Sequence, residues 1–187
     1  MAVQSYVREK GTSAENNWQE NLGRVLGSAS SISRISIVGV GHSLRGDDYV
    51  GSLIAKSLAK CTGNSAENGV YIFDAEENVE KVVRKLIRVA PRHVIFIDAC
   101  EMHAKPGEAR FLSIEETSYP FFTTHGIPLK LLAHQFLTES EAWVLAIQPA
   151  SFEFNDRPST EVDEAANAII KFIASSLTEA SCKCLRN

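Results

Sequence analysis

The stretch His93-Val94-Ile95-Phe96-Ile97 is almost entirely apolar and is followed at once by Asp98. A strand of this composition is typical of a parallel sheet, in which both faces are covered by other elements. We therefore expect it at the centre of a sheet. Strand and helix patterns alternate on both sides of it, which predicts an α/β fold of three layers, with a mostly parallel central sheet covered by helices on both faces.

The other elements follow from hydrophobic periodicity. Strands are expected at 35–40, 69–73, 93–97 and 143–147, with a short one at 109–112, and helices at about 49–60, 79–90, 128–137 and 159–177. Residues 1–33 are expected to form an amino-terminal extension with one candidate helix. A single α/β domain is expected over 34–178, followed by a tail over 179–187.

Composition narrows the class of protein. The chain has 187 residues, of which 44% are hydrophobic, and its mean hydropathy is -0.07, as in a soluble globular domain. The chain has 19 Lys and Arg and 23 Asp and Glu, which give a net charge of -4. This charge provides no positive field that would attract nucleic acid, so nucleic acid is not expected as a partner. No apolar run approaches the length of about 20 residues that spans a bilayer, so no membrane insertion is expected. Four sparse cysteines and the lack of a signal-peptide pattern favour the cytoplasm.

The loop after the first strand, Gly39 to Asp48, only partly resembles a dinucleotide-binding loop. Leu44 stands in place of the third glycine of that motif. Asp47 and Asp48 stand where the next helix begins, and their charges would repel a phosphate. The loop therefore suits a cation better, with one aspartate capping the helix and the other available to a ligand.

Three side chains are candidates for a metal site, because ligands bind beyond the carboxyl ends of parallel strands. Asp48 follows the first strand, Asp98 ends the apolar third strand, and His125 precedes a helix whose positive end favours neutral imidazole. Two carboxylates and one imidazole suit a divalent cation such as nickel or zinc. The alternative for Asp98 is capping or a hydrogen bond to a neighbouring loop. Asp74, at the end of the second strand, is a weaker candidate.

Other catalytic schemes have little support. The chain has neither a G-x-S-x-G nor an H-E-x-x-H motif. Cys100 is a candidate thiol nucleophile, but a buried structural cysteine is the favoured interpretation. Cys182 and Cys184 lack a second pair of ligands at a suitable spacing and are assigned to the tail.

Several motifs, taken in order, resemble the nickel-iron hydrogenase maturation endopeptidases. They lie at 38–51, 94–99, 106–107, 123–129 and 147–149, and the resemblance covers roughly residues 34–175. Within that family, Glu77-Asn78 and Thr123-Thr124-His125 are similar to the hydrogenase 3 type of maturation peptidase.

The resemblance implies a hydrolase that removes a carboxy-terminal extension from the hydrogenase large-subunit precursor after nickel insertion. Nickel would arrive with the precursor, and no organic cofactor is implied. Asp48, Asp98 and His125 correspond to the residues that contact this nickel, in an aspartic or metal-dependent peptidase without a conventional triad. Either aspartate could act as general base. Asp74 matches a further acidic position.

One departure from the family pattern concerns His42, which stands where the family usually has Asn. It is either an added metal ligand or a hydrogen-bonding side chain of the loop, and the second is favoured. Three other functions stay open: a noncatalytic nickel-sensing accessory protein, a flavodoxin-like or nucleotide-binding module, and a peptidase of similar fold with another substrate.

Overall fold

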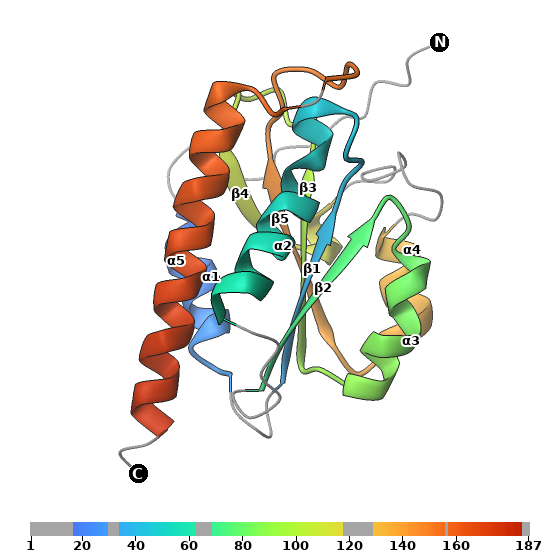
Figure 1. The fold of residues 1–187 in the computed structure, drawn as a ribbon. Coiled ribbons are helices and arrows are strands. Elements are labelled where there is room, and N and C mark those ends of the chain that lie inside the picture. Colours follow the sequence, from blue (N-terminus) through green and yellow to red (C-terminus); the bar gives the residue numbers. More distant parts are fainter. Residues whose placement is uncertain (1–16, 30–33, 63–68, 118–128, 156, 185–187) are drawn as a thin grey trace.

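The structure is a computed structural model that describes residues 17–29, 34–62, 69–117, 129–155 and 157–184. Its centre is a five-stranded sheet in the order β2-β1-β3-β5-β4 (Figure 1). The strands are β1 (Ile35–Val40), β2 (Val70–Glu76), β3 (His93–Ala99), β4 (Ala109–Ser113) and β5 (Glu141–Ile147). All neighbours pair in parallel except β4, which pairs antiparallel with β5. The prediction of a mostly parallel sheet with β3 at its centre is confirmed, and every residue of β3 is buried.

Helices cover both faces of this sheet, as predicted (Figure 1). One face carries α1 (Trp18–Leu26), α2 (Val50–Thr62) and α5 (Thr160–Cys184), and the other carries α3 (Glu80–Val89) and α4 (Leu129–Phe136). Two short 3-10 helices, η1 (Gly46–Tyr49) and η3 (Ile114–Glu116), lie in the connections. The apolar core is divided accordingly into one cluster on each side of the sheet.

The helix of the amino-terminal segment packs into the core. Leu22 and Leu26 of α1 are fully buried, and the ring of Trp18 lies edge-to-face against Phe172 of α5, with centroids 5.4 Å apart. Asn17 caps α1 by accepting a hydrogen bond from the N–H of Glu20. A large apolar contact of this kind holds the segment to the domain.

Several elements run further than expected, among them β2, β3 and α5. β2 reaches Glu76 and β3 reaches Ala99, because neighbouring strands continue to pair with the polar ends; Gly39 pairs with Asp74 and Asp98 with Ala146. Asp74 and Asp98 therefore lie within strands. α5 continues to Cys184, so residues 178–184, which were expected beyond this helix, belong to it.

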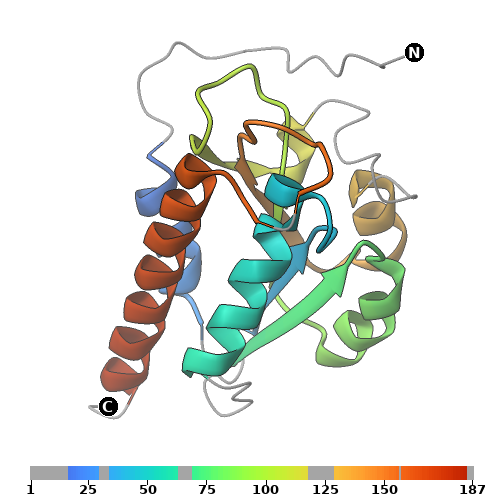
Figure 2. The same ribbon diagram turned by 45° about the horizontal axis from the view of Figure 1, so that its top comes forward.

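The connections at the carboxyl ends of the parallel strands meet at one end of the molecule. Figure 2 brings this end forward and shows η1, the β3–β4 connection and the β5–α5 connection around it. Hydrogen bonds join them, since Gly46 N–H donates to Asn155 O and Gly107 N–H donates to Gln148 O. Sites in open parallel sheets form at such an edge. Among the helices described, none is both long and apolar enough to cross a membrane.

Candidate active site

Glycines bring the start of α2 against the ends of β1 and β3. A Cβ added to Gly51 would lie 2.8 Å from the carbonyl carbon of Ile97 and closer still to its oxygen, and one on Gly39 would collide with Gly51 and Ala55. Gly41 has φ +146°, and its Cβ would overlap the carbonyl group of Asp48. The glycines of this loop therefore serve close packing of backbone on backbone, which places η1 over the end of β3.

Asp98 is a buried carboxyl group, 1% exposed, near the end of β3. Its Oδ1 accepts the Ala99 N–H at 2.9 Å, whereas its Oδ2 has no hydrogen-bond partner among the described residues. Burial, reinforced by the negative charge of Asp48, raises the pKa of Asp98 well above its usual value, and the Ala99 N–H offsets this in part. A carboxyl group in such a place either holds a proton or needs a positive partner.

Asp48 is the second buried carboxylate of the site, and its side chain is fully shielded within η1. Its Oδ2 accepts the backbone N–H of His42 at 3.2 Å. Its charge acts on Asp98, so the two groups lie close enough to repel one another. Because negative charges close together in a buried site repel one another, the pair suits a bound cation.

The third residue of the predicted site, His125, lies in 118–128, outside the described residues. Within the described part of the chain, no three His, Cys, Asp or Glu side chains are grouped so that they could hold a metal ion. The structure thus brings together Asp48 and Asp98, and the predicted role of His125 stays a prediction.

Asp47 has a structural role that sequence reasoning did not assign. It is 3% exposed and accepts the N–H groups of Ala150 and Ser151, at 2.7 and 3.2 Å, and both the N–H and the hydroxyl of Ser159. Of the two adjacent aspartates, Asp47 therefore anchors the β5–α5 connection and the start of α5. The N–H groups that donate to Asp47 belong to residues more than 100 positions away in the chain, in the β5–α5 connection and at the start of α5.

Asp74 is held by its neighbours on α2. Its Oδ1 accepts the Ser52 hydroxyl at 2.7 Å and the Glu76 N–H at 3.1 Å, and its Oδ2 pairs with the Lys56 ammonium at 3.1 Å. These contacts attach α2 to β2, which gives the Asp74 carboxylate a structural role.

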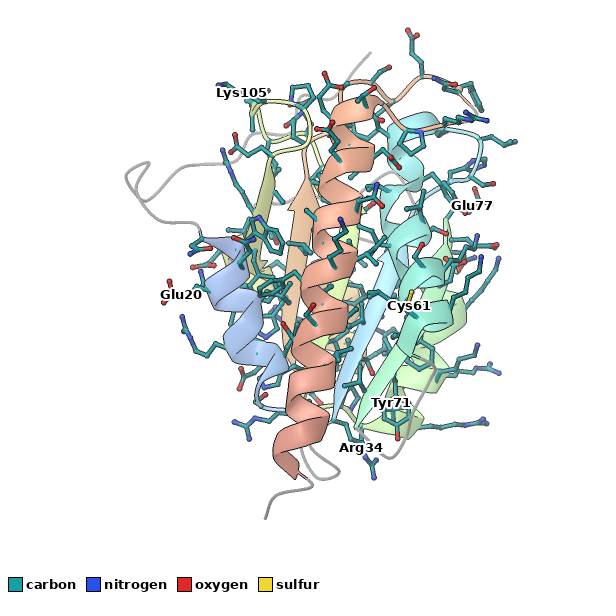
Figure 3. All side chains as sticks on the ribbon, turned by 60° about the vertical axis from the view of Figure 1, so that its left-hand side comes forward. Glu20, Arg34, Cys61, Tyr71, Glu77 and Lys105 are labelled. Carbon is teal, nitrogen blue, oxygen red and sulfur yellow. The ribbon has the colours of Figure 1, made fainter. Side chains whose placement is uncertain are left out.

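Both ring nitrogens of His42 have polar partners. Its Nδ1 accepts the Leu44 N–H at 3.1 Å, and its Nε2 lies 3.1 Å from Glu77 Oε2. Figure 3 labels Glu77 at the same end of the molecule as Lys105, with Arg34 and Tyr71 at the opposite end. In this arrangement His42 links its loop to the segment that follows β2 and presents no vacant nitrogen to a metal.

Cys100 is buried, 5% exposed, as predicted for a structural cysteine. Its Sγ lies 3.6 Å from the carbonyl oxygen of Asp98. Burial, followed by the charges of Asp98 and Asp48, raises the pKa of the Cys100 thiol well above its usual value, so the reactive thiolate is disfavoured.

Gln148 organises the β3–β4 connection and was not identified as a functional side chain from the sequence. It is 4% exposed; its Oε1 accepts the N–H groups of Met102 and Ala104, and its Nε2 donates to Glu101 and to the Pro149 carbonyl. The motif Ile147-Gln148-Pro149 was the feature of the sequence that could have identified this residue. Its role depends on partners more than 40 residues away in the chain.

Comparison with solved structures establishes the class of fold. The chain is similar to the crystal structure of a [NiFe] hydrogenase maturation protease HycI from Thermococcus kodakarensis KOD1, with a TM-score of 0.73, 29% identity, and coverage of 84% of this chain and 99% of that one. The crystal structure of the Hydrogenase 3 Maturation protease has a TM-score of 0.65 at 24% identity, over 76% of this chain and 90% of that one.

The family follows from the sequence match. The chain belongs to the HycI hydrogenase maturation protease family, whose model matches residues 54–176. It is 35% identical to the Hydrogenase 3 maturation protease of Escherichia coli (strain K12) over 114 residues, which are 59% of this chain and 69% of that protein. The resemblance found in the sequence is thereby confirmed, and the chain is a peptidase.

Proposed function

We propose that this chain removes the carboxy-terminal extension of a nickel-iron hydrogenase large-subunit precursor after nickel insertion, with the precursor's nickel as the recognition element. Membership of the HycI family supports the peptidase activity, and the relative named Hydrogenase 3 maturation protease supports this class of substrate. The observation that carries the proposal is the pair of buried carboxylates, Asp48 and Asp98, at the carboxyl edge of the sheet.

A divalent cation suits this pair on electrostatic grounds. Two buried like charges destabilise one another, and a cation between them replaces repulsion with attraction. Asp98 Oδ2, which has no hydrogen-bond partner among the residues described, is an oxygen that such a cation would satisfy. In the proposal, His125 contributes a third, neutral ligand. Carboxylate and imidazole together are a donor set that nickel accepts.

The chemistry then requires a hydrolytic water and a base. Nickel carried by the precursor would hold its tail at the site, polarise the scissile carbonyl group and lower the pKa of a bound water. Asp48 or Asp98 takes the proton from that water. A raised pKa makes a carboxylate a stronger base, which favours Asp98 for this role. We therefore classify the reaction as aspartic or metal-dependent peptide hydrolysis, without an organic cofactor.

The proposal places the reaction in the cytoplasm. Cys61 and Cys100 are free thiols, which fits a reducing compartment.

The first test compares nickel-loaded with nickel-free precursor. Each is incubated with the purified protein, and the mass of the large subunit is followed. We expect loss of a carboxy-terminal peptide only from the nickel-loaded form. Equal cleavage of both forms would refute nickel recognition. Retained binding without cleavage would favour the noncatalytic nickel-sensing alternative.

The second test assigns the residues. We expect Asp48→Asn, Asp98→Asn and His125→Ala to abolish cleavage while circular dichroism stays that of the folded protein. The matched control is Asp74→Asn, the same change in a carboxylate already engaged by Ser52 and Lys56, which should still cleave. Full activity in either Asp48→Asn or Asp98→Asn would remove that residue from the mechanism.

A further inference from the structure

Two connections beside the site carry an unusual share of exposed apolar side chains. We use the name apolar rim for Leu44, from the β1–η1 connection, with Phe152 and Phe154, from the β5–α5 connection. Their exposed fractions are 55%, 36% and 74%. In the described part of the chain, six large apolar side chains are exposed, and these are three of them. Apolar side chains that gather on one surface mark an interaction site more often than isolated ones do.

The apolar rim is supported by backbone pairing. Arg45 and Asn155 form a parallel β-bridge, with Gly46 N–H donating to Asn155 O at 2.8 Å and Asn155 N–H donating to Leu44 O at 3.1 Å. The Arg45 guanidinium lies over the Phe154 ring, 5.3 Å from its centroid. Asp47 ties the same two connections together through Ala150 and Ser151. A partner that binds here meets a surface ordered in advance, which lowers the entropic cost of binding.

The apolar rim is continuous with the carboxylate pair. His42, in the same connection as Leu44, donates its N–H to Asp48 Oδ2. Leu44 is four residues from Asp48 in the sequence, so the two Cα atoms are at most about 14 Å apart. Leu44 is in turn hydrogen-bonded to Asn155, the neighbour of Phe154. A peptide whose scissile bond lies at Asp48 and Asp98 therefore reaches the apolar rim with about four extended residues.

We propose that the apolar rim binds an apolar, extended part of the precursor chain within about four residues of the scissile bond. This inference rests on the proposed function and identifies where the substrate peptide lies next to the carboxylates. We choose the substrate peptide as the occupant because the apolar rim adjoins Asp48, and a peptide bound at Asp48 must pass this surface. Aromatic side chains are enriched at the centre of such contacts, where a few residues contribute most of the affinity.

The test is cleavage of the nickel-loaded precursor by the full-length protein carrying Leu44→Ser and Phe154→Ser together. We expect KM to rise about tenfold, with kcat within about twofold of the unchanged protein, since neither side chain belongs to the carboxylate pair. The matched control is Phe136→Ser, which removes an aromatic ring of 41% exposure from α4, on the other face of the sheet. The control should leave both constants unchanged.

The outcomes separate this inference from the proposed function. An unchanged KM in the double variant, while the unaltered protein cleaves, would overturn docking at the apolar rim and leave the proposed function standing. Absence of cleavage by both the unaltered protein and the Phe136→Ser control would overturn the proposed function. In that case, calorimetric titration with the precursor decides the docking: about tenfold weaker binding by the double variant supports it, and equal or absent binding refutes it.

Discussion

The close approach of α2 to the sheet predicts opposite effects for the same substitution at two helical glycines. In Gly51→Ala, the new Cβ would lie 2.8 Å from the carbonyl carbon of Ile97 and also overlap the Val40 carbonyl, and both obstacles are backbone. In Gly23→Ala, the nearest obstacle is the tip of the Phe172 ring, at an ordinary distance of 3.4 Å. Only the first substitution forces a helix away from the strands.

The magnitudes follow from packing and helix propensity. Overpacking costs about 3 kcal/mol where backbone must move, and alanine in a helix recovers about 1 kcal/mol relative to glycine. Gly51→Ala should therefore lower the free energy of unfolding by about 2 kcal/mol, and Tm by about 4–8 °C. Gly23→Ala should raise the free energy of unfolding by about 1 kcal/mol and Tm by about 2–4 °C.

Urea unfolding followed by circular dichroism measures both variants against the unaltered protein. Because Asp48 stands just before α2, Gly51→Ala should also lower precursor cleavage at temperatures where it remains folded. If Gly51→Ala proved as stable as Gly23→Ala, the close packing of α2 on β1 and β3 would be refuted, and with it the account of how Asp48 reaches Asp98.

Three further predictions concern side chains at this end of the sheet. The raised pKa of Asp98 means that its contribution to stability is complete below its unfolded pKa and is lost as pH rises toward the folded value. In urea titrations, the free energy of unfolding of Asp98→Asn should therefore rise relative to that of the unaltered protein as pH increases from about 4; a difference that falls with pH would contradict this. Asp47→Ala leaves three backbone N–H groups and the Ser159 hydroxyl without their acceptor and should lower the free energy of unfolding by at least about 3 kcal/mol, whereas a loss under about 1 kcal/mol would show that water replaces it. Cys100→Ala should keep precursor cleavage within about twofold, and a folded but inactive variant would revive a thiol mechanism.

Much of the fold could be predicted because its signals are local. The run Val94 to Ile97 has no polar face, so it had to lie between two layers of helices, and it does. The ends of β2 and β3 were placed too early, since the polar residues Asp74 and Asp98 interrupt the apolar pattern while their backbones continue to pair. Pairing of this kind depends on a neighbouring strand, so it cannot be predicted from the type of the residue itself.

The site was predicted in part. The acidic ends of the first and third strands pointed to Asp48 and Asp98, because parallel strands bring their carboxyl ends to one edge. Asp48 was predicted as the site residue, although its neighbour Asp47 is chemically identical. The tertiary structure distinguishes the two, because the N–H groups of Ala150, Ser151 and Ser159 donate to Asp47.

Hydrophobic periodicity was sufficient to predict the α/β fold, because the burial of an apolar face depends on the spacing of neighbouring residues. The hydrogenase maturation family was indicated by the resemblance of several motifs in their order along the chain. Tertiary contacts alone distinguished the roles of the polar side chains. Asp74 is neutralised by Lys56, Gln148 holds a distant connection, and Asp98 stays buried beside Asp48. The energy of a polar group depends on the partners and solvent around it, which chain segments far apart in the sequence supply only after folding.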